Sequence, residues 1–248
     1  MPSLARALSK LGFCSRTQAA QLIRAGKVRV NSVVRRDSET PVRLDKDRIE
    51  IDGQQLKAAA KIYLALNKPR GIVTTASDEK GRDTVYALLG AELPWVAPVG
   101  RLDKASEGLL LLTNDSEWAA RVTAPETHLD KTYHVQIGEI ADGALIESLK
   151  NGIRAKEGET LRVKSASLLR QGERNSWLEI ILDEGKNRHI RRMLEALGIE
   201  VLRLIRVAIG PLALGDLAKG AVRDLGTDEK LALDLAMRSN TNKTARNL

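Results

Sequence analysis

The sequence predicts an α+β protein with a small basic domain followed by a larger domain built on a mainly antiparallel or mixed sheet. The pattern changes near residue 62, from short helices and a hairpin to longer strands with intervening helices. The apolar fraction of 43% is enough for a core. The length of 248 residues fits one or two domains at roughly 150 residues each.

Local patterns place the elements of the first domain. Apolar side chains at helical spacing, each series followed by a glycine, predict helices over residues 3–12 and 16–25. Two alternating runs around Asn31 predict a hairpin, and residues 48–51 predict one more strand. These elements form a helix–helix–hairpin domain over residues 1–53.

The second domain is expected over residues 62–237, after a polar and alanine-rich linker at 54–61. Residues 108–113 predict a buried central strand because four consecutive leucines lie within them. The polar, basic tail at 238–248 predicts disorder. Other strands are predicted over residues 62–66, 72–75, 132–137, 161–168, 177–182, 201–207 and 212–217, and helices over 85–89, 115–122, 187–197 and from 227.

The positive charge is concentrated at the N-terminus. The net charge is +8, and residues 1–36 hold eight basic side chains and no acidic one. Such a segment is typical of a polyanion binder, although a solvated basic face would have the same composition. The candidate contacts to such a polyanion are Arg16, Arg24, Lys27 and Arg29.

This basic segment resembles the small RNA-binding domain of ribosomal protein S-four, the α-L domain. The resemblance rests on two ordered runs, Leu8-Ser9-Lys10-Leu11-Gly12-Phe13-Cys14-Ser15-Arg16 and Ile23-Arg24-Ala25-Gly26-Lys27-Val28-Arg29-Val30-Asn31. It implies that a basic helix face lies against the phosphate backbone of structured RNA, a contact that positions the protein without reading sequence.

A charged segment adjoins the most apolar strand of the second domain. Gly100-Arg101-Leu102-Asp103 is followed by residues 104–107 and then by the leucine run. An aspartate beside a buried sheet is partly desolvated and needs a basic partner. From the residues alone, Asp103 is either a reactive carboxylate or a loop residue paired with Arg101 or Lys104.

Four ordered motifs resemble those of the RsuA-type ribosomal RNA pseudouridine synthases. The first is Gly100-Arg101-Leu102-Asp103 with Ser106 and Gly108-Leu109-Leu110-Leu111-Leu112-Thr113-Asn114-Asp115. The others are Lys131-Thr132-Tyr133, then Glu184-Gly185-Lys186-Asn187-Arg188-His189-Ile190-Arg191-Arg192-Met193, and then Leu204-Ile205-Arg206-Val207 with Gly210-Pro211-Leu212. With the N-terminal segment, the resemblance spans residues 3 to about 225.

The resemblance implies an isomerase that converts a specific uridine of ribosomal RNA to pseudouridine, with base flipping and no cofactor or metal. Asp103 would be the nucleophile, Tyr133 would lie against the base, and Lys186 would pair with Asp103. The sequence departs from the common pattern at Lys186, where arginine is more usual, and at His189, where glutamine often stands. Further phosphate contacts are expected from Arg101, Arg188, Arg191 and Arg192, and more weakly from Lys68 and Arg70.

Several classes of protein do not fit the composition. No apolar run approaches the ~18 residues of a membrane span, and the first residues lack a secretory signal. Cys14 is the single cysteine and the three histidines are scattered, so a disulfide or a zinc site is not expected. The default expectations are the cytoplasm, a monomer, and ribosomal RNA or an assembly intermediate as the partner.

Two other functions stay open on the residues. A non-catalytic RNA-binding or ribosome-assembly protein would use the same basic domain, but would not need Asp103, Tyr133 and Lys186 together. A nuclease or glycosidase would need a second acid near Asp103, for which Glu107 is the nearest in sequence.

Overall fold

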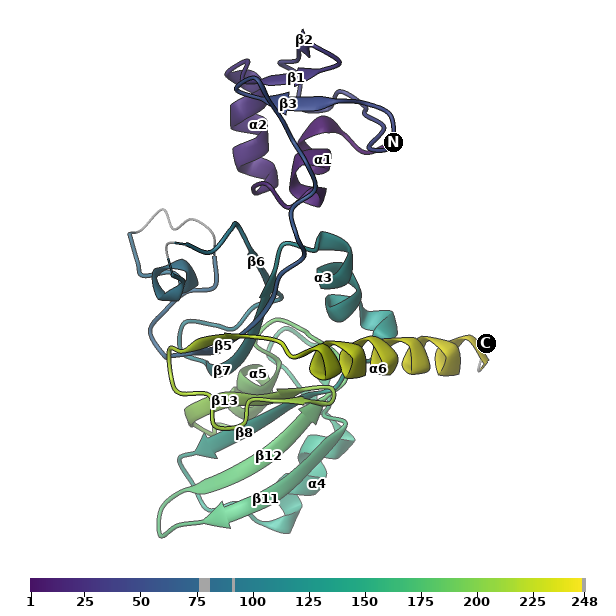
Figure 1. The fold of residues 1–248 in the computed structure, drawn as a ribbon. Helices are drawn as coiled ribbons and strands as arrows, with labels where there is room; N and C mark the ends of the chain where they lie inside the picture. The colour runs from purple at the N-terminus through teal and green to yellow at the C-terminus, as the bar shows by residue number, and fades with distance from the viewer. Residues whose placement is uncertain (76–80, 91, 247–248) are drawn as a thin grey trace.

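The computed structural model describes residues 1–75, 81–90 and 92–246, and places them in two domains joined by an extended segment (Figure 1). The first domain packs two helices against one face of a small antiparallel sheet of order β2-β1-β3-β4. Its elements are α1 (Leu4–Lys10), α2 (Arg16–Arg24), β1 (Val28–Val30), β2 (Val33–Val34), β3 (Ile49–Ile51) and β4 (Gln54–Gln55).

Local chemistry explains why these elements form. The Ser15 hydroxyl accepts a hydrogen bond from the Gln18 amide, and the Gln18 side chain accepts one from the Ser15 amide, which completes a capping box at the start of α2. Asn31 and Ser32 both have positive φ, as a two-residue turn between twisted strands requires. The predicted helices and hairpin of this domain are confirmed.

The second domain is built on a mixed sheet of order β11-β12-β8-β13-β7-β5-β15, with β6 and β14 beside it. β13 runs parallel to β7, and the other neighbouring pairs along this path are antiparallel. The strands are β5 (Tyr63–Lys68), β6 (Ala97–Val99), β7 (Glu107–Thr113), β8 (Lys131–Ile137), β11 (Ser165–Gln171), β12 (Ser176–Leu182), β13 (Val201–Ile209), β14 (Leu212–Ala213) and β15 (Val222–Asp224), with the separate hairpin β9 (Ile153–Arg154) and β10 (Thr160–Leu161).

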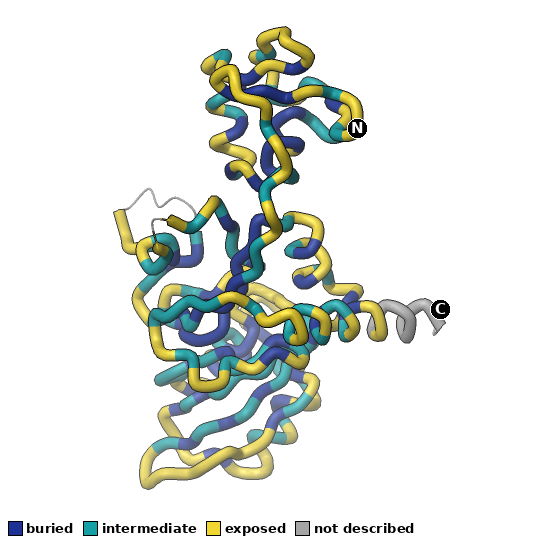
Figure 2. The backbone as a smooth tube through the Cα atoms, viewed as in Figure 1, coloured by how far each residue is buried: buried dark blue, intermediate teal, exposed yellow. Residues whose placement is uncertain are grey.

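Helices cover this sheet and leave β7 buried at its centre. Every residue of β7 is buried, as predicted from its leucines, and Figure 2 shows this dark core between exposed outer strands. Leu109 and Leu111 pack on one face of β7, whereas Leu110 and Leu112 pack on the other. The helices are η1 (Val85–Leu88), α3 (Ser116–Thr123), η2 (Pro125–Thr127), α4 (Gly143–Asn151), α5 (His189–Ala196) and α6 (Thr227–Arg246).

Several expectations from the sequence need correction. The strand predicted over residues 161–168 is divided between β10 and β11, and the strand predicted over 212–217 is limited to β14. Residues 72–75 form only an isolated bridge, between Val73 and Thr84, instead of a strand. The expected linker begins too early, because β4 pairs with β3 and extends the first sheet. The tail expected to be disordered continues α6 as far as Arg246, since no proline or glycine ends that helix; residues 247 and 248 lie outside the described part. Helix α4 was not foreseen.

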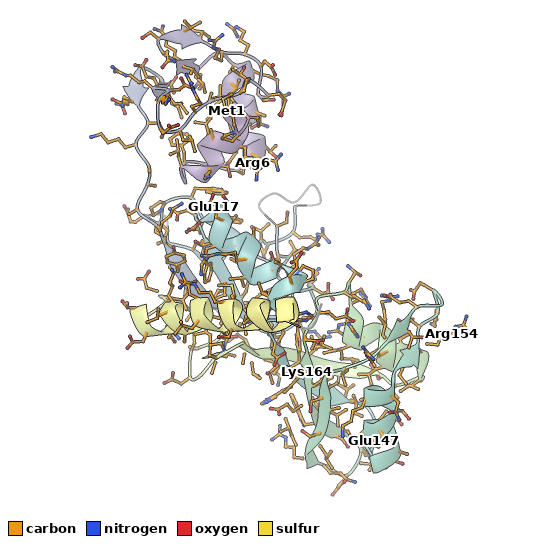
Figure 3. The ribbon with its side chains drawn as sticks, turned by 90° about the vertical axis from the view of Figure 1, so that its right-hand side faces the viewer. Met1, Arg6, Glu117, Glu147, Arg154 and Lys164 are labelled. Carbon is orange, nitrogen blue, oxygen red and sulfur yellow. The ribbon has the colours of Figure 1, made fainter. Side chains whose placement is uncertain are left out.

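The two domains touch where α1 meets the start of α3. Lys10 and Glu117 form an ion pair of 2.7 Å, and Figure 3 shows Glu117 at the end of α3 that faces the first domain. Buried Asn114 accepts a hydrogen bond from the Ile62 amide and donates one to the Ala60 carbonyl, which ties the linker to the sheet. No helix in the described chain is long and apolar enough to cross a membrane.

Candidate active site

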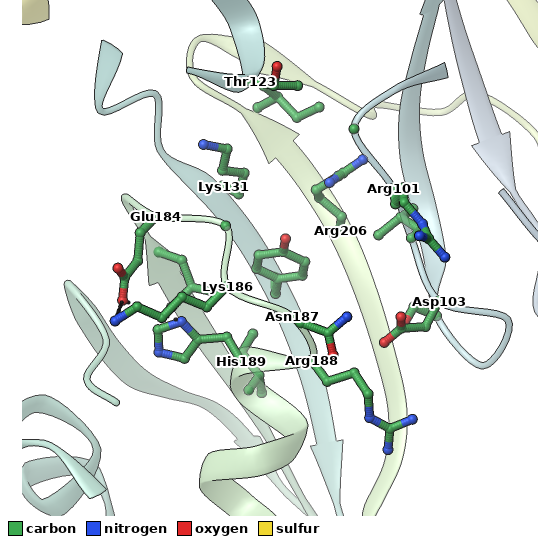
Figure 4. Close-up of a pocket in the computed structure, with 18 of the residues that line it drawn as sticks. Arg101, Asp103, Thr123, Lys131, Glu184, Lys186, Asn187, Arg188, His189 and Arg206 are labelled. Atoms are coloured by element: carbon green, nitrogen blue, oxygen red, sulfur yellow. Dashed lines mark ion pairs between the residues drawn. The ribbon is translucent and has the colours of Figure 1, made fainter. Parts of the chain in front are cut away.

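A cavity of about 670 Å³ opens on the second domain between the segment that precedes β7 and the segment that precedes α5. Its walls come from residues 99–106, from β8 and β13, and from residues 182–191. Asp103, Tyr133 and Lys186, the three predicted catalytic residues, all line it, as do Arg101, Arg188 and Arg191. Figure 4 shows Asp103 on one side of this cavity, with Glu184 and Lys186 on the other.

A buried lysine holds the backbone of the loop that contains Asp103. Lys68 is fully buried, and its Nζ donates to the carbonyl oxygens of Pro69, Asp103 and Ser106 at 3.0, 3.2 and 2.8 Å. Burial lowers the pKa of Lys68 to about 8, although Asp103 and Glu107 act in the opposite direction. The weak prediction of Lys68 as a phosphate contact is therefore wrong, because its ammonium is buried and donates its hydrogen bonds to the loop backbone.

A threonine completes this backbone support. The Thr74 hydroxyl donates a hydrogen bond to the Leu102 carbonyl at 2.8 Å and accepts one from the Leu102 amide at 3.3 Å. The Gly71 amide donates to the Lys104 carbonyl at 2.8 Å. The loop is thus held by its main chain on both sides of Asp103, which leaves the carboxylate half-buried at the cavity wall.

Arg191 is the basic residue of α5 that reaches the Asp103 loop. Its Nη2 donates to the Ala105 carbonyl at 3.0 Å, and its Nε is buried without a hydrogen-bond partner in the described structure. Burial lowers the pKa of Arg191, and the negative charge of Asp103 opposes that shift. The guanidinium is therefore a partly desolvated positive charge beside Asp103.

Lys186 does not make the predicted ion pair with Asp103. Its Nζ lies 2.9 Å from Glu184 and 3.2 Å from Glu159, on the opposite side of the cavity (Figure 4). The hydrogen bond that Lys186 donates to the Glu184 carboxylate raises the pKa of Lys186. The physical reason is that α5 begins at His189, so residues 184–188 form an irregular loop that directs Lys186 away from Asp103.

The remaining predicted contacts separate into accessible and neutralised groups. Arg101 and Arg188 are exposed at the cavity and available to phosphates. Arg192 is held by Glu157 and Glu159 at 2.9 and 3.0 Å, and only 18% of its side chain is exposed. This neutralisation argues against the predicted phosphate contact of Arg192.

Glu107 does not serve as a second acid of the cavity. Its carboxylate is buried and pairs with Arg203 and Lys219 at 3.1 and 2.6 Å. It does not line the cavity that holds Asp103. The nuclease or glycosidase interpretation therefore loses the carboxylate that lies nearest to Asp103 in the sequence, and Glu184, which faces Asp103 across the cavity, is paired with Lys186 at 2.9 Å.

In the first domain, all four predicted RNA contacts are exposed. Arg16 and Arg24 lie at the two ends of α2, and Lys27 and Arg29 lie on and beside β1. Lys27 approaches Asp52 at 3.9 Å, with both side chains more than half exposed. The basic surface is therefore open to solvent, as binding to an RNA backbone requires.

Two cations of the cavity were not singled out from the sequence. Lys131 on β8 and Arg206 on β13 line the same cavity, and Arg206 is almost fully buried. Both lie within family-like motifs, but nothing in the motif pattern distinguishes a lysine or arginine that faces a cavity from one on the outer surface.

The comparisons with known proteins agree with this architecture. Residues 62–196 match the family model described as RNA pseudouridylate synthase, and residues 4–58 match the S4 domain. The chain belongs to the RNA pseudouridylate synthase family, and it is an isomerase. The resemblance predicted from the four motifs and the N-terminal domain is confirmed.

Two relatives match nearly the whole chain. Ribosomal large subunit pseudouridine synthase B of Bacillus subtilis is 37% identical over 230 residues, which cover 92% of this chain and 94% of the relative. An RNA pseudouridine synthase of Aquifex aeolicus is 38% identical over 223 residues, which cover 90% of this chain and 89% of the relative. A crystal structure of a pseudouridylate synthase matches with a TM-score of 0.65 and 29% identity, over 94% of this chain and all of that one.

Proposed function

We propose that this enzyme isomerises a specific uridine of ribosomal RNA, with Asp103 as its nucleophile. The observation that carries the proposal is that Asp103, Tyr133 and Arg191 line the same cavity. A partly desolvated guanidinium beside a half-buried carboxylate orients it and stabilises its negative charge when substrate excludes water. Such an arrangement suits a carboxylate that attacks as a nucleophile.

The reaction breaks the bond between N1 of uracil and C1′ of ribose and forms a bond between C5 and C1′. C5 loses its proton and N1 gains one, so no electron donor or acceptor is needed. Asp103 attacks either the ribose C1′ or the base, and Tyr133 stacks on the extruded uracil. Arg191, rather than Lys186, is the counter-charge of Asp103 in this proposal.

In this proposal, residues of both domains contribute to the affinity for RNA. Base flipping costs a few kcal/mol, so contacts outside the cavity must offset it. The exposed cations Arg16, Arg24, Lys27 and Arg29 would hold the backbone of structured RNA, while Arg101 and Arg188 would bind it at the cavity mouth. The name of the Bacillus subtilis relative specifies the large ribosomal subunit, which makes large-subunit RNA the first substrate to test.

The test is to incubate the protein with large- and small-subunit ribosomal RNA transcripts and to map pseudouridine chemically. We expect product at a discrete site with the wild type and none with Asp103→Asn. The matched control is Asp216→Asn, which removes an exposed carboxylate that does not line the cavity and should leave product formation unchanged. Absence of product with the wild type on both RNAs would contradict the substrate, and full activity of Asp103→Asn would contradict the mechanism.

A further inference from the structure

Two cations share the cavity with Asp103 and have no role in the chemistry proposed above. Arg206 on β13 is the register partner of Tyr133 on β8, and Lys131 lies two residues before Tyr133 on the same strand. Directly opposed residues, and residues two apart, point to one face of a sheet. Lys131, Tyr133 and Arg206 therefore point into the cavity from a common floor.

Arg206 is fixed in place but incompletely bonded. Its Nε donates to the Leu109 carbonyl at 2.7 Å, while its buried Nη2 has no hydrogen-bond partner in the described structure. Only 5% of the residue is exposed. A buried guanidinium with an unused donor is costly unless a ligand completes its bonding.

Lys131 adds a second positive charge to the same region. Burial, and then the positive charge of Arg206, lower the pKa of Lys131. Of the two carboxylates that oppose this shift, Asp130 pairs with Lys164 at 2.7 Å, and Asp183 lines the same cavity. Figure 4 shows Lys131 and Arg206 on the side of the cavity nearest Thr123, apart from the Glu184–Lys186 pair.

We propose that Lys131 and Arg206 form an anion subsite on the cavity floor that binds a backbone phosphate adjacent to the target uridine. The inference rests on the proposed function, because it supplies the phosphate from the same RNA strand. Two like charges in a desolvated site are stabilised by an anion, and an arginine fork matches the oxygens of a phosphate. Uracil, which is neutral at pH 7, would relieve neither charge.

The subsite is tested with two small probes, uridine and uridine 3′,5′-bisphosphate, in NMR titrations of the whole protein. We expect the wild type to bind the bisphosphate about 10-fold more tightly than uridine, because Lys131 and Arg206 would donate charge-assisted hydrogen bonds to one phosphate. In Arg206→Gln and in Lys131→Gln this preference should fall to about 2-fold, with the affinity for uridine unchanged. Lys150→Gln, which removes an exposed cation of α4 outside the cavity, should keep the full preference.

Each outcome bears on the proposal. An unchanged preference in both cavity variants would overturn it, and so would an equal loss of affinity for both probes, because that pattern indicates contact with the base. If Arg206→Gln does not fold, Lys131→Gln alone decides, since its side chain is less buried than that of Arg206. The titration does not depend on turnover, so its result is separate from the RNA product assay that tests the proposed function.

Discussion

Gly108 on β7 lies against the backbone of Arg206 on β13 so closely that a Cβ atom at residue 108 would stand 2.3 Å from the Arg206 carbonyl oxygen and 2.8 Å from its nitrogen. Gly108 also has a φ of +99°, which side-chain-bearing residues rarely adopt. The two strands are parallel neighbours at this point. The absence of a side chain at residue 108 thus lets the strand that follows the Asp103 loop pack closely against the strand that carries Arg206.

We therefore expect Gly108→Ala to lower the free energy of unfolding by about 3 kcal/mol or more, through strain and forced separation of β7 from β13. Gly71→Ala is the matched control, because Gly71 has a φ of +97° and no heavy atom within 4 Å of a built Cβ. Urea denaturation of both variants separates the two effects. Equal losses would show that backbone conformation alone requires glycine at residue 108.

A second prediction concerns the counter-charge of Asp103. Arg191 bonds the Asp103 loop, whereas Lys186 pairs with Glu184 and Glu159. We expect Arg191→Gln to reduce kcat on the RNA substrate about 100-fold, a loss typical of one removed electrostatic contact in an active site. Lys186→Gln should reduce kcat by only about 3-fold. Single-turnover assays at saturating enzyme measure both, and the reverse order of effects would restore Lys186 as the partner.

The contrast between Arg191 and Lys186 shows where sequence reasoning stops. The motif places four basic residues within seven positions, but only the start of α5 at His189 decides which of them faces Asp103. Lys68 was misjudged for a related reason, since lysines are rarely fully buried and no local pattern marks the exception. The apolar helix spacing, the hairpin turn and the leucine run are local patterns, and they were predicted. The parallel neighbours β7 and β13 lie almost a hundred residues apart in the chain. Their pairing depends on the tertiary fold, so no local sequence pattern predicts it.

A third prediction concerns the basic surface of the first domain. Arg16 and Arg24 are exposed on α2, so each is free to neutralise a phosphate. The slope of log K against log salt is about −0.9 per contacted phosphate on a duplex, so the double variant Arg16→Gln/Arg24→Gln should flatten it by about 2. Filter binding to structured ribosomal RNA over a series of salt concentrations measures the slope. The control, Lys150→Gln/Lys156→Gln, removes two exposed cations of the second domain, and an equal flattening there would contradict the assignment of the surface.

The last prediction uses the buried lysine beneath Asp103. The pKa of Lys68 is lowered to about 8 in the folded protein, against 10.5 for an ordinary lysine. Between pH 8 and 10.5 the unfolded chain therefore binds more protons than the folded chain, so the contribution of Lys68 to stability rises with pH in this window. Below pH 8 the ammonium is charged in both states and its contribution is constant.

We expect the difference in unfolding free energy between wild type and Lys68→Met to increase by up to about 3 kcal/mol from pH 8 to pH 10.5. Taking the difference removes the other groups that titrate in this range. Lys150→Met, at an exposed and ion-paired site, should show no such increase. Because neutral Lys68 has one donor fewer for the carbonyls of Pro69, Asp103 and Ser106, the same titration should loosen the Asp103 loop. Catalysis should therefore decline above pH 8 while the fold persists, and a kcat that stays flat to pH 9.5 would separate Lys68 from the positioning of Asp103.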